Sequence, residues 1–259
     1  IPPGCLVLTG GIDVQGDRLE LKLLGHGRGR RMWILDYVVL PGNPPRMLEA
    51  AGRGEGPLAD YLVTTFANRF GRELRIEATA IDTGHHTQDV YNFVRAARQL
   101  PAARRPRRLM AVKGANAPGK PVLPGRPQPQ DVNWRGKVIR RGVMLWMVGT
   151  DTAKSMLFDR LKSDAELEPA ARLVHFSKDL PEDYYLQLTA ERFDPEKNKW
   201  VKLRNRRNEA LDLWVYSTAA AYHPEVRVQA LRPRDWQYLE QLLEPPGAVP
   251  TEPGQTPPP

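Results

Sequence analysis

Three aspartates interrupt apolar segments that lie far apart in the chain. A lone carboxylate in such a segment is costly to bury unless a cation compensates it. Three of them converging on Mg²⁺ or Mn²⁺ would offset that cost and would create a site for hydrolysing phosphodiesters. The three positions are Asp13, at the end of the strand-like run Leu6–Val14; Asp82, directly after the run Leu74–Ile81; and Asp212, inside the helical stretch Asn208–Tyr222.

Size and charge narrow the class of protein. A chain of 259 residues, 41% of them hydrophobic, can bury a substantial core and fits one large α/β domain with appendages or two small domains. The formal net charge of +8 favours a polyanionic partner, with nucleic acid first and an anionic membrane second. The membrane is the weaker choice, because no apolar stretch approaches the ~18–20 residues that a spanning helix needs.

The cysteine count and the first residues bear on cellular context. The single cysteine, Cys5, excludes an intrachain disulfide and a zinc-finger spacing, and it suits a reducing cytoplasm. The chain begins Ile1-Pro2-Pro3-Gly4, with neither an initiator methionine nor a signal-peptide pattern. We therefore expect it to be a piece of a longer polypeptide.

The order of strand and helix patterns predicts an α/β fold with a mixed sheet. Three strands joined by tight turns are expected to form an antiparallel meander, and a β–α–β–α–β order then adds parallel strands flanked by helices. The expected elements are strands Leu6–Val14, Arg18–His26 and Met32–Leu40, helix Leu58–Phe70, strand Leu74–Ile81, helix Thr87–Leu100 and strand Leu109–Val112.

The second half of the chain is less regular. Five prolines in 113–137 predict a long exposed loop, and Arg140-Arg141-Gly142 predicts a hairpin turn within Val138–Val148. We expect a folded domain over 1–222 and an extension over 223–259, whose Pro-rich tail is largely disordered because it cannot pack a core. Further expected elements are helix Thr150–Leu161, strand Leu173–Phe176, helix Pro181–Thr189, strand Trp200–Leu203, helix Asn208–Tyr222 and the amphipathic piece Pro233–Leu243.

Each acid also has a simpler interpretation. Asp13 could start an Asx turn, Asp82 could cap the following helix, and Asp212 could be a solvated helix residue, although apolar neighbours surround it. Glu209 shares a helix face with Asp212 and could be a fourth ligand or a supporting group. It could equally be an acid favoured by the helix macrodipole.

Basic residues could guide a polyanion to the acids. Lys113 follows a strand expected beside the one that ends at Asp82, so it could neutralise a scissile phosphate or simply begin the basic loop. His85 and His86 could contact DNA or be incidental, and Asp151 is expected to cap a helix. The candidate DNA-binding residues are Arg140, Arg141, Lys199, Lys202, Arg204, Arg206 and Arg207.

An ordered series of motifs over roughly residues 5–222 resembles one known family. The series resembles the nuclease domain of the large terminase subunit of lambda-like tailed bacteriophages, and any single motif alone would be weak. The motifs are Gly11-Ile12-Asp13-Val14-Gln15, Asp17-Arg18-Leu19-Glu20, Ile81-Asp82-Thr83-Gly84, Thr87-Gln88, Val112-Lys113-Gly114, Val148–Lys154, Gln187–Glu191 and Arg207–Asp212.

The resemblance implies a ribonuclease-H-like endonuclease that cuts concatemeric viral DNA in the host bacterial cytoplasm. It implies two divalent metal ions, Mg or Mn, with ligands Asp13, Asp82 and Asp212. It also implies an ATPase motor preceding residue 1, a small terminase subunit and a portal protein of the procapsid as partners, and no membrane. No G-x-x-x-x-G-K-[ST] stretch occurs in the chain, so we expect no ATP hydrolysis from it alone.

Two other functions remain open from the sequence. One is another ribonuclease-H-like nuclease, such as a resolvase or a transposase, which the ordered motif series disfavours. The other is a non-catalytic DNA-binding or assembly module, in which the acids are structural and the basic face docks duplex DNA. No base-reading helix is visible, so we expect cleavage with little sequence preference.

Overall fold

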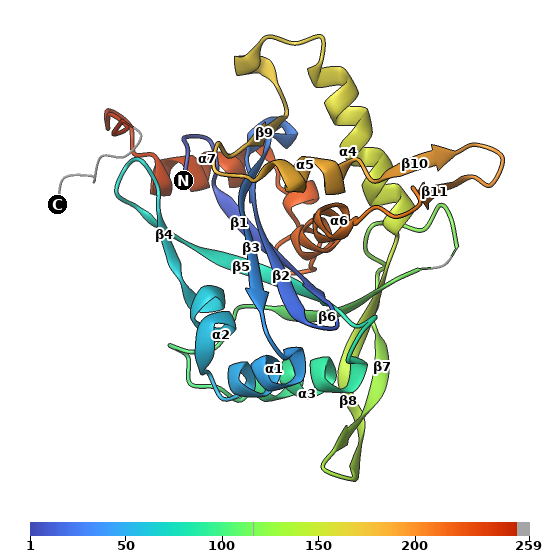
Figure 1. Cartoon of the computed structure of the whole chain (residues 1–259). Coiled ribbons are helices and arrows are strands. Elements are labelled where there is room, and N and C mark those ends of the chain that lie inside the picture. Colours follow the sequence, from blue (N-terminus) through green and yellow to red (C-terminus); the bar gives the residue numbers. More distant parts are fainter. Residues whose placement is uncertain (116, 253–259) are drawn as a thin grey trace.

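The chain builds a nine-stranded mixed sheet with helices on both faces (Figure 1). The structure, a computed structural model, describes residues 1–115 and 117–252. The sheet order is β7-β8-β6-β5-β1-β2-β3-β9, with β4 paired to β5. The strands are β1 (Val7–Val14), β2 (Arg18–His26), β3 (Met32–Pro41), β4 (Thr65–Ala67), β5 (Glu73–Asp82), β6 (Leu109–Gly114), β7 (Gln128–Trp134), β8 (Lys137–Val148) and β9 (Val174–Phe176), with β10 (Glu191–Asp194) and β11 (Lys199–Lys202) forming a separate pair.

The predicted antiparallel meander is confirmed in β1, β2 and β3. Strands β5, β6 and β8 then join β1 as parallel neighbours, which confirms the mixed sheet. The register of β1 against β5 places Ile12 beside Ile81. Asp13 and Asp82, each one residue further along, therefore lie at the same edge of the sheet.

Helices cover the two faces of the sheet unequally. On one face α6 crosses β1, β2 and β5 and contacts α4 and α5. On the other face α1, α2 and α3 pack over a separate apolar cluster that includes Ile12 and Val90. The helices are α1 (Pro44–Gly52), α2 (Gly56–Val63), α3 (Thr87–Ala97), α4 (Thr150–Asp164), α5 (Glu182–Leu188), α6 (Glu209–Ala221) and α7 (Pro233–Leu243), with short 3-10 turns at Arg28–Arg30, Pro169–Ala171 and Val228–Ala230.

Several elements differ from the sequence prediction, and α1 and β10 were not predicted at all. The helix expected over Leu58–Phe70 stops at Val63, because the following residues pair as β4 with the start of β5. The prediction of a hairpin turn at 140–142 is wrong, because β8 is one long strand through these residues. It pairs with β7, which lies inside the segment 113–137 that was predicted to be a loop. Prolines did not prevent β7, since it lies at the edge of the sheet, where a missing N–H is tolerated.

The segment after His223 packs on the body of the molecule. Trp236 and Leu243 of α7 are buried beside Leu6 and Leu8 at the start of β1. The Thr251 N–H donates to the Arg69 carbonyl at 2.9 Å. The last residues of the expected disordered tail, 253–259, lie outside the described residues. Within the part that is described, no helix is long and apolar enough to cross a bilayer.

Candidate active site

The three aspartates converge because α6 lies directly on β1. A Cβ added at Gly11 would come within 2.8 Å of the Leu213 carbonyl oxygen and 2.9 Å of the Ser217 amide nitrogen. Only glycine therefore allows the backbone of α6 this close to the strand that carries Asp13. This approach brings Asp212, in the first turn of α6, next to the ends of β1 and β5.

Burial and mutual repulsion act on these carboxyl groups. Burial raises the pKa of Asp13 well above its usual 3.8, and the charges of Asp212 and Asp82 raise it further, against a hydrogen bond from Gln15. The Gln15 amide nitrogen donates to Asp13 Oδ2 at 2.7 Å. The charge of Asp82 also raises the pKa of Asp212, so the three predicted aspartates share one poorly solvated region.

Asp82 is held by its own turn. Burial raises its pKa, while the Gly84 N–H and the Tyr216 hydroxyl lower it in part. The Gly84 N–H donates to Asp82 Oδ2 at 2.8 Å. A Cβ on Gly84 would stand 2.7 Å from that oxygen, so the turn has no room for a larger residue. Tyr216 comes from α6, which thus supports Asp82 as well as carrying Asp212.

Asp212 belongs to a closed polar network, which we call the Lys154 network: Lys154, Glu191, Asn208 and Asp212. Lys154 Nζ lies 2.7 Å from Glu191 Oε1 and 3.1 Å from Asp212 Oδ1. The Asn208 side-chain nitrogen donates to both acids, at 2.8 Å and 2.9 Å. Burial raises the pKa of Asp212, and Lys154 opposes that rise. Sequence reasoning assigned no role to Lys154 or Glu191, although both lie in motifs that carry the family resemblance.

A second network lies beside Asp13 on β2. Glu20 stands opposite Asp13 in the β1–β2 register, and its fully buried carboxylate accepts from Arg18 at 2.6 Å and Arg207 at 2.5 Å. Glu209 pairs with the same two arginines, at 3.2 Å and 3.3 Å. Glu209, predicted as a possible fourth ligand, therefore has its charge compensated by arginines in this structure.

The aspartates suit a divalent cation by their chemistry more than by their present arrangement. Within residues 1–115 and 117–252, no three His, Cys, Asp or Glu side chains are grouped so that they could hold a metal ion. The carboxylates instead bond to Gln15, Gly84 and the Lys154 network. Nevertheless, hard oxygen donors whose buried charges repel one another are the donor set that Mg²⁺ and Mn²⁺ prefer.

Comparison with known proteins decides the family. A family-wide sequence profile described as "Terminase large subunit gpA, endonuclease domain" matches residues 1–236. The chain belongs to this family. The recognition made from the ordered motifs is thereby confirmed, and the match includes the segment that carries the three converging aspartates.

Individual relatives agree with this membership. The large terminase subunit of Escherichia phage lambda is 32% identical over 239 residues, and that of Enterobacteria phage P21 is 29% identical over 232 residues. Each alignment covers 85% of this chain and 33% of the relative. The chain therefore spans about a third of the length of the curated relatives it matches. No solved structure matches it.

Four further residues named from the sequence, Lys113, His85, His86 and Asp151, lie on different elements of this terminase endonuclease domain. Lys113 is exposed near the end of β6, next to Val112, which pairs with Asp82. His85 is exposed, and His86 lies 3.8 Å from Asp89. Asp151 does not cap α4, whose cap residue is Gly149; it accepts the Trp200 N–H at 3.1 Å.

The predicted DNA-binding residues of the terminase domain are exposed cations, and one of them, Arg207, is held in ion pairs. Arg140 and Arg141 are exposed on the β7–β8 ribbon, which projects from the body (Figure 1). Arg207 is instead bound to acids: its guanidinium contacts Glu20, Glu209 and Asp183. The other predicted cations, exposed on β11 and the segment before α6, are Lys199, Lys202, Arg204 and Arg206.

Proposed function

We propose that this domain is a metal-dependent endonuclease that cuts concatemeric double-stranded DNA during packaging of a viral genome. One observation carries the proposal: Asp13, Asp82 and Asp212 are brought together in a buried region, where Asp212 and Asp82 act on the pKa of Asp13 and Asp82 acts on that of Asp212. The family description as an endonuclease domain supports the same reaction class.

The aspartates would hold two divalent cations, Mg²⁺ or Mn²⁺. When bound, such a pair activates a water molecule and stabilises the leaving oxygen of a phosphodiester. The chain itself contributes orientation: Gln15 fixes Asp13, and Gly84 fixes Asp82. Bonds of this kind hold carboxylates in place on rigid strand ends, as a preorganised hydrolytic site requires.

Lys154 and Lys113 are proposed to act at opposite sides of the aspartates. Lys154 bridges Asp212 and Glu191, so it favours the ionised form of Asp212 and orients it. Lys113 is exposed, and it is proposed to approach the scissile phosphate of bound DNA. Glu209 is proposed to orient the start of α6 through its two arginines.

A cationic track is proposed to lead duplex DNA to the aspartates. The β7–β8 ribbon supplies Arg140 and Arg141. Arg207, which is ion-paired with Glu20 and Glu209, is proposed to border the track. Contacts from such cations would be to phosphates, which position a duplex without reading its sequence. The other members of the track are Lys199, Lys202, Arg204 and Arg206.

The rest of the packaging machine is proposed from the relatives, which are named large terminase subunits. We propose that an ATPase motor domain belongs to the same polypeptide, before residue 1. A small terminase subunit and the portal protein are proposed as assembly partners in the host bacterial cytoplasm. Residues 1–222 are proposed as the nuclease domain, with 223–259 as its extension.

Plasmid cleavage tests the proposal. The purified chain is incubated with supercoiled DNA and Mn²⁺, Mg²⁺ or EDTA, beside Asp13→Asn, Asp82→Asn and Asp212→Asn. We expect metal-dependent nicking and linearisation, reduced by about 10³-fold or more in each variant, because each removes a cation ligand. Asp17→Asn is the matched control, since Asp17 is an exposed acid of the same segment.

A second readout separates cation binding from cleavage. Mn²⁺ should raise the melting temperature of the parent and the Asp17→Asn control, since a cation that binds only the folded state stabilises it. The shift should be absent in Asp13→Asn. Cleavage at the parental rate by Asp13→Asn would overturn the site, and tight DNA binding without any cleavage would favour a docking module.

A further inference from the structure

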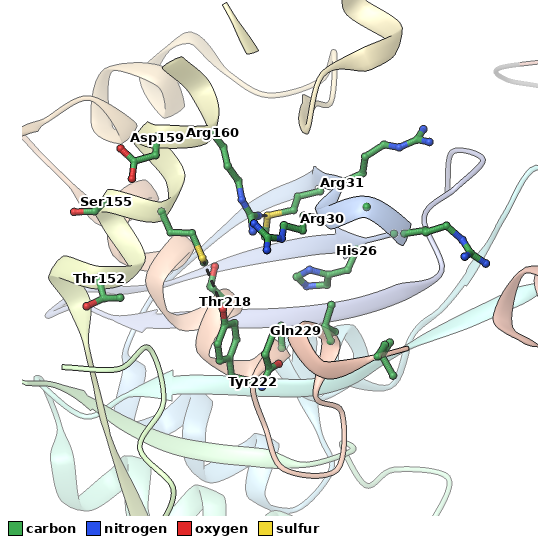
Figure 2. Close-up of a pocket in the computed structure, with 18 of the residues that line it drawn as sticks. His26, Arg30, Arg31, Thr152, Ser155, Asp159, Arg160, Thr218, Tyr222 and Gln229 are labelled. Atoms are coloured by element: carbon green, nitrogen blue, oxygen red, sulfur yellow. Dashed lines mark hydrogen bonds between the residues drawn. The ribbon is translucent and has the colours of Figure 1, made fainter. Parts of the chain in front are cut away.

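A large cavity lies near the end of α6 remote from Asp212. Its volume is about 1010 Å³, and it opens between the β2–β3 turn, α4, the last turn of α6 and the start of α7. None of the three aspartates lines it. We call it the arginine pocket, after Arg30, Arg31 and Arg160; His26, Thr218 and Tyr222 also line it (Figure 2).

Most arginines of the pocket are not held in ion pairs. Arg30, Arg31 and Arg160 form no ion pair with any residue in 1–115 or 117–252. Arg28, in the same turn, differs because it pairs with Glu240 at 2.7 Å. The two acids in the lining are Asp151, which accepts the Trp200 N–H, and Asp159. The lining therefore carries more guanidinium groups than carboxylates.

Arg160 is the most constrained of these cations. Its side chain is partly buried and its guanidinium contacts the Met32 sulfur, a weak acceptor. Figure 2 shows its guanidinium beside that of Arg30. Burial and the charge of Arg30 lower the pKa of Arg160, and Tyr222 and Asp164 oppose that effect in part. Two converging guanidinium groups that form no ion pair repel each other, and an anion between them would remove that repulsion.

The wall formed by α6 offers a free hydroxyl. Thr218 is 1% exposed, and its Oγ1 has no hydrogen-bond partner among the described residues. A helical threonine commonly donates to the carbonyl four residues earlier. That carbonyl, of Trp214, already accepts from Ser217 Oγ at 3.3 Å. The Thr218 hydroxyl is thus an unpartnered buried donor at the wall of a cationic pocket.

We propose that the arginine pocket binds a phosphoryl group, held by Arg30 and Arg160 with Thr218 as a further donor. The planar fork of a guanidinium matches two phosphate oxygens, and hydrogen bonds between ionised partners are about twice as strong as neutral ones. The same chemistry is offered by a free nucleotide and by a backbone phosphate of DNA. The pocket volume accommodates either, with Tyr222 beside the charged groups.

Direct binding measurements test the pocket and identify the source of the phosphate. The parent chain is titrated by calorimetry with pyrophosphate, with ADP and with a short DNA duplex, all in EDTA and at matched ionic strength. The same titrations use Arg160→Met, which keeps the length of the side chain and removes its charge. Lys162→Met is the control, because Lys162 is an exposed cation of the same helix.

We expect Arg160→Met to weaken binding about tenfold or more, with Lys162→Met unchanged. Loss confined to ADP and pyrophosphate assigns the pocket to a free nucleotide, and loss confined to the duplex assigns it to a backbone phosphate. Thr218→Val, which keeps the side-chain shape, should weaken the same ligand several-fold even if Arg160→Met does not fold. Equal affinities in all these proteins, or no binding by the parent, would overturn the proposal. These outcomes do not depend on cleavage.

Discussion

Helix α4 places two cationic side chains in two regions of opposite charge. Lys154 enters the region of the aspartates, where Asp212 and Glu191 surround it. Arg160, less than two turns later, enters the arginine pocket, where it forms no ion pair with a described carboxylate and Arg30 lies beside it. The first region has an excess of negative charge that Lys154 partly offsets. The second has more guanidinium groups than carboxylates.

The macrodipole of α6 agrees with this division. Asp212 lies in its first turn, where the partial positive charge of a helix N-terminus favours acids. The arginine pocket is lined by residues of its last turn, where the opposite partial charge favours cations. The dipole is worth only ~0.3–1 kcal/mol per charge at an exposed site, so it assists both regions without balancing either. Each region is therefore suited to a ligand of opposite charge.

Removing the two cations should have opposite consequences, and this is the largest expected effect. Burial lowers the pKa of Lys154, but Asp212 and Glu191 outweigh that effect and raise it. Lys154→Met leaves both acids without their cation, which should cost about 3 kcal/mol and lower the melting temperature by roughly 6–12 °C. Arg160→Met removes a charge that forms no ion pair. The melting temperature of this variant should therefore lie within ~2 °C of that of the parent, or be higher.

The comparison requires EDTA and a buffer free of phosphate, so that neither region is filled. Lys162→Met again controls for loss of an exposed cation from α4. A Lys154→Met protein as stable as the parent would show that the Lys154 network does not hold the fold together. An Arg160→Met protein destabilised as strongly as Lys154→Met would show that the guanidinium is already satisfied within the structure.

The two regions also differ in how far the sequence predicted them. Asp13 and Asp82 could be placed together because alternation predicts the strands and parallel neighbours share an edge. Lys154 and Glu191 are 37 residues apart, in α4 and β10, and no local pattern indicates their contact. The turn that contains Arg30 has the composition of an ordinary solvated turn, so only tertiary packing shows that it borders a cavity.

Asp13→Asn should reveal the cost of burying the Asp13 carboxylate beside Asp82 and Asp212. Because burial, Asp212 and Asp82 raise the pKa of Asp13 in the folded state, the folded protein binds a proton more tightly than the unfolded chain. Stability is therefore lost as pH rises through the interval above 3.8. Asp13→Asn removes this penalty and should be more stable than the parent by about 1–3 kcal/mol at pH 7.

Urea unfolding in EDTA between pH 4 and pH 7 measures this difference. The advantage of Asp13→Asn should grow as pH rises and shrink toward pH 4. Asp17→Asn should show no such trend, since Asp17 is exposed. An Asp13→Asn protein less stable than the parent at pH 7 would mean that the carboxylate is well compensated in the absence of metal, contrary to the repulsion inferred here.

His26, in the lining of the arginine pocket, should give the smallest effect and the opposite dependence on pH. Burial and the charge of Arg160 lower the pKa of His26 from 6.5 to about 3. Below pH 6.5, His26 therefore binds a proton in the unfolded chain but not in the folded protein. Stability is lost as pH falls. At pH 5.5 the loss should be about 1.4 kcal/mol.

His26→Gln isolates this contribution. Thr9 Oγ1 donates to the Ser217 carbonyl at 2.9 Å, so His26 Nε2, 2.8 Å away, must donate to Thr9, and a glutamine amide can replace that donor. The variant should lose less stability than the parent between pH 7 and pH 5.5, while His85→Gln, at an exposed histidine, should follow the parent. If parent and His26→Gln change in parallel, His26 accepts a proton in the folded state. An additional positive charge would then be tolerated near the last turn of α6. That result would contradict the inference that the arginine pocket already has an excess of positive charge.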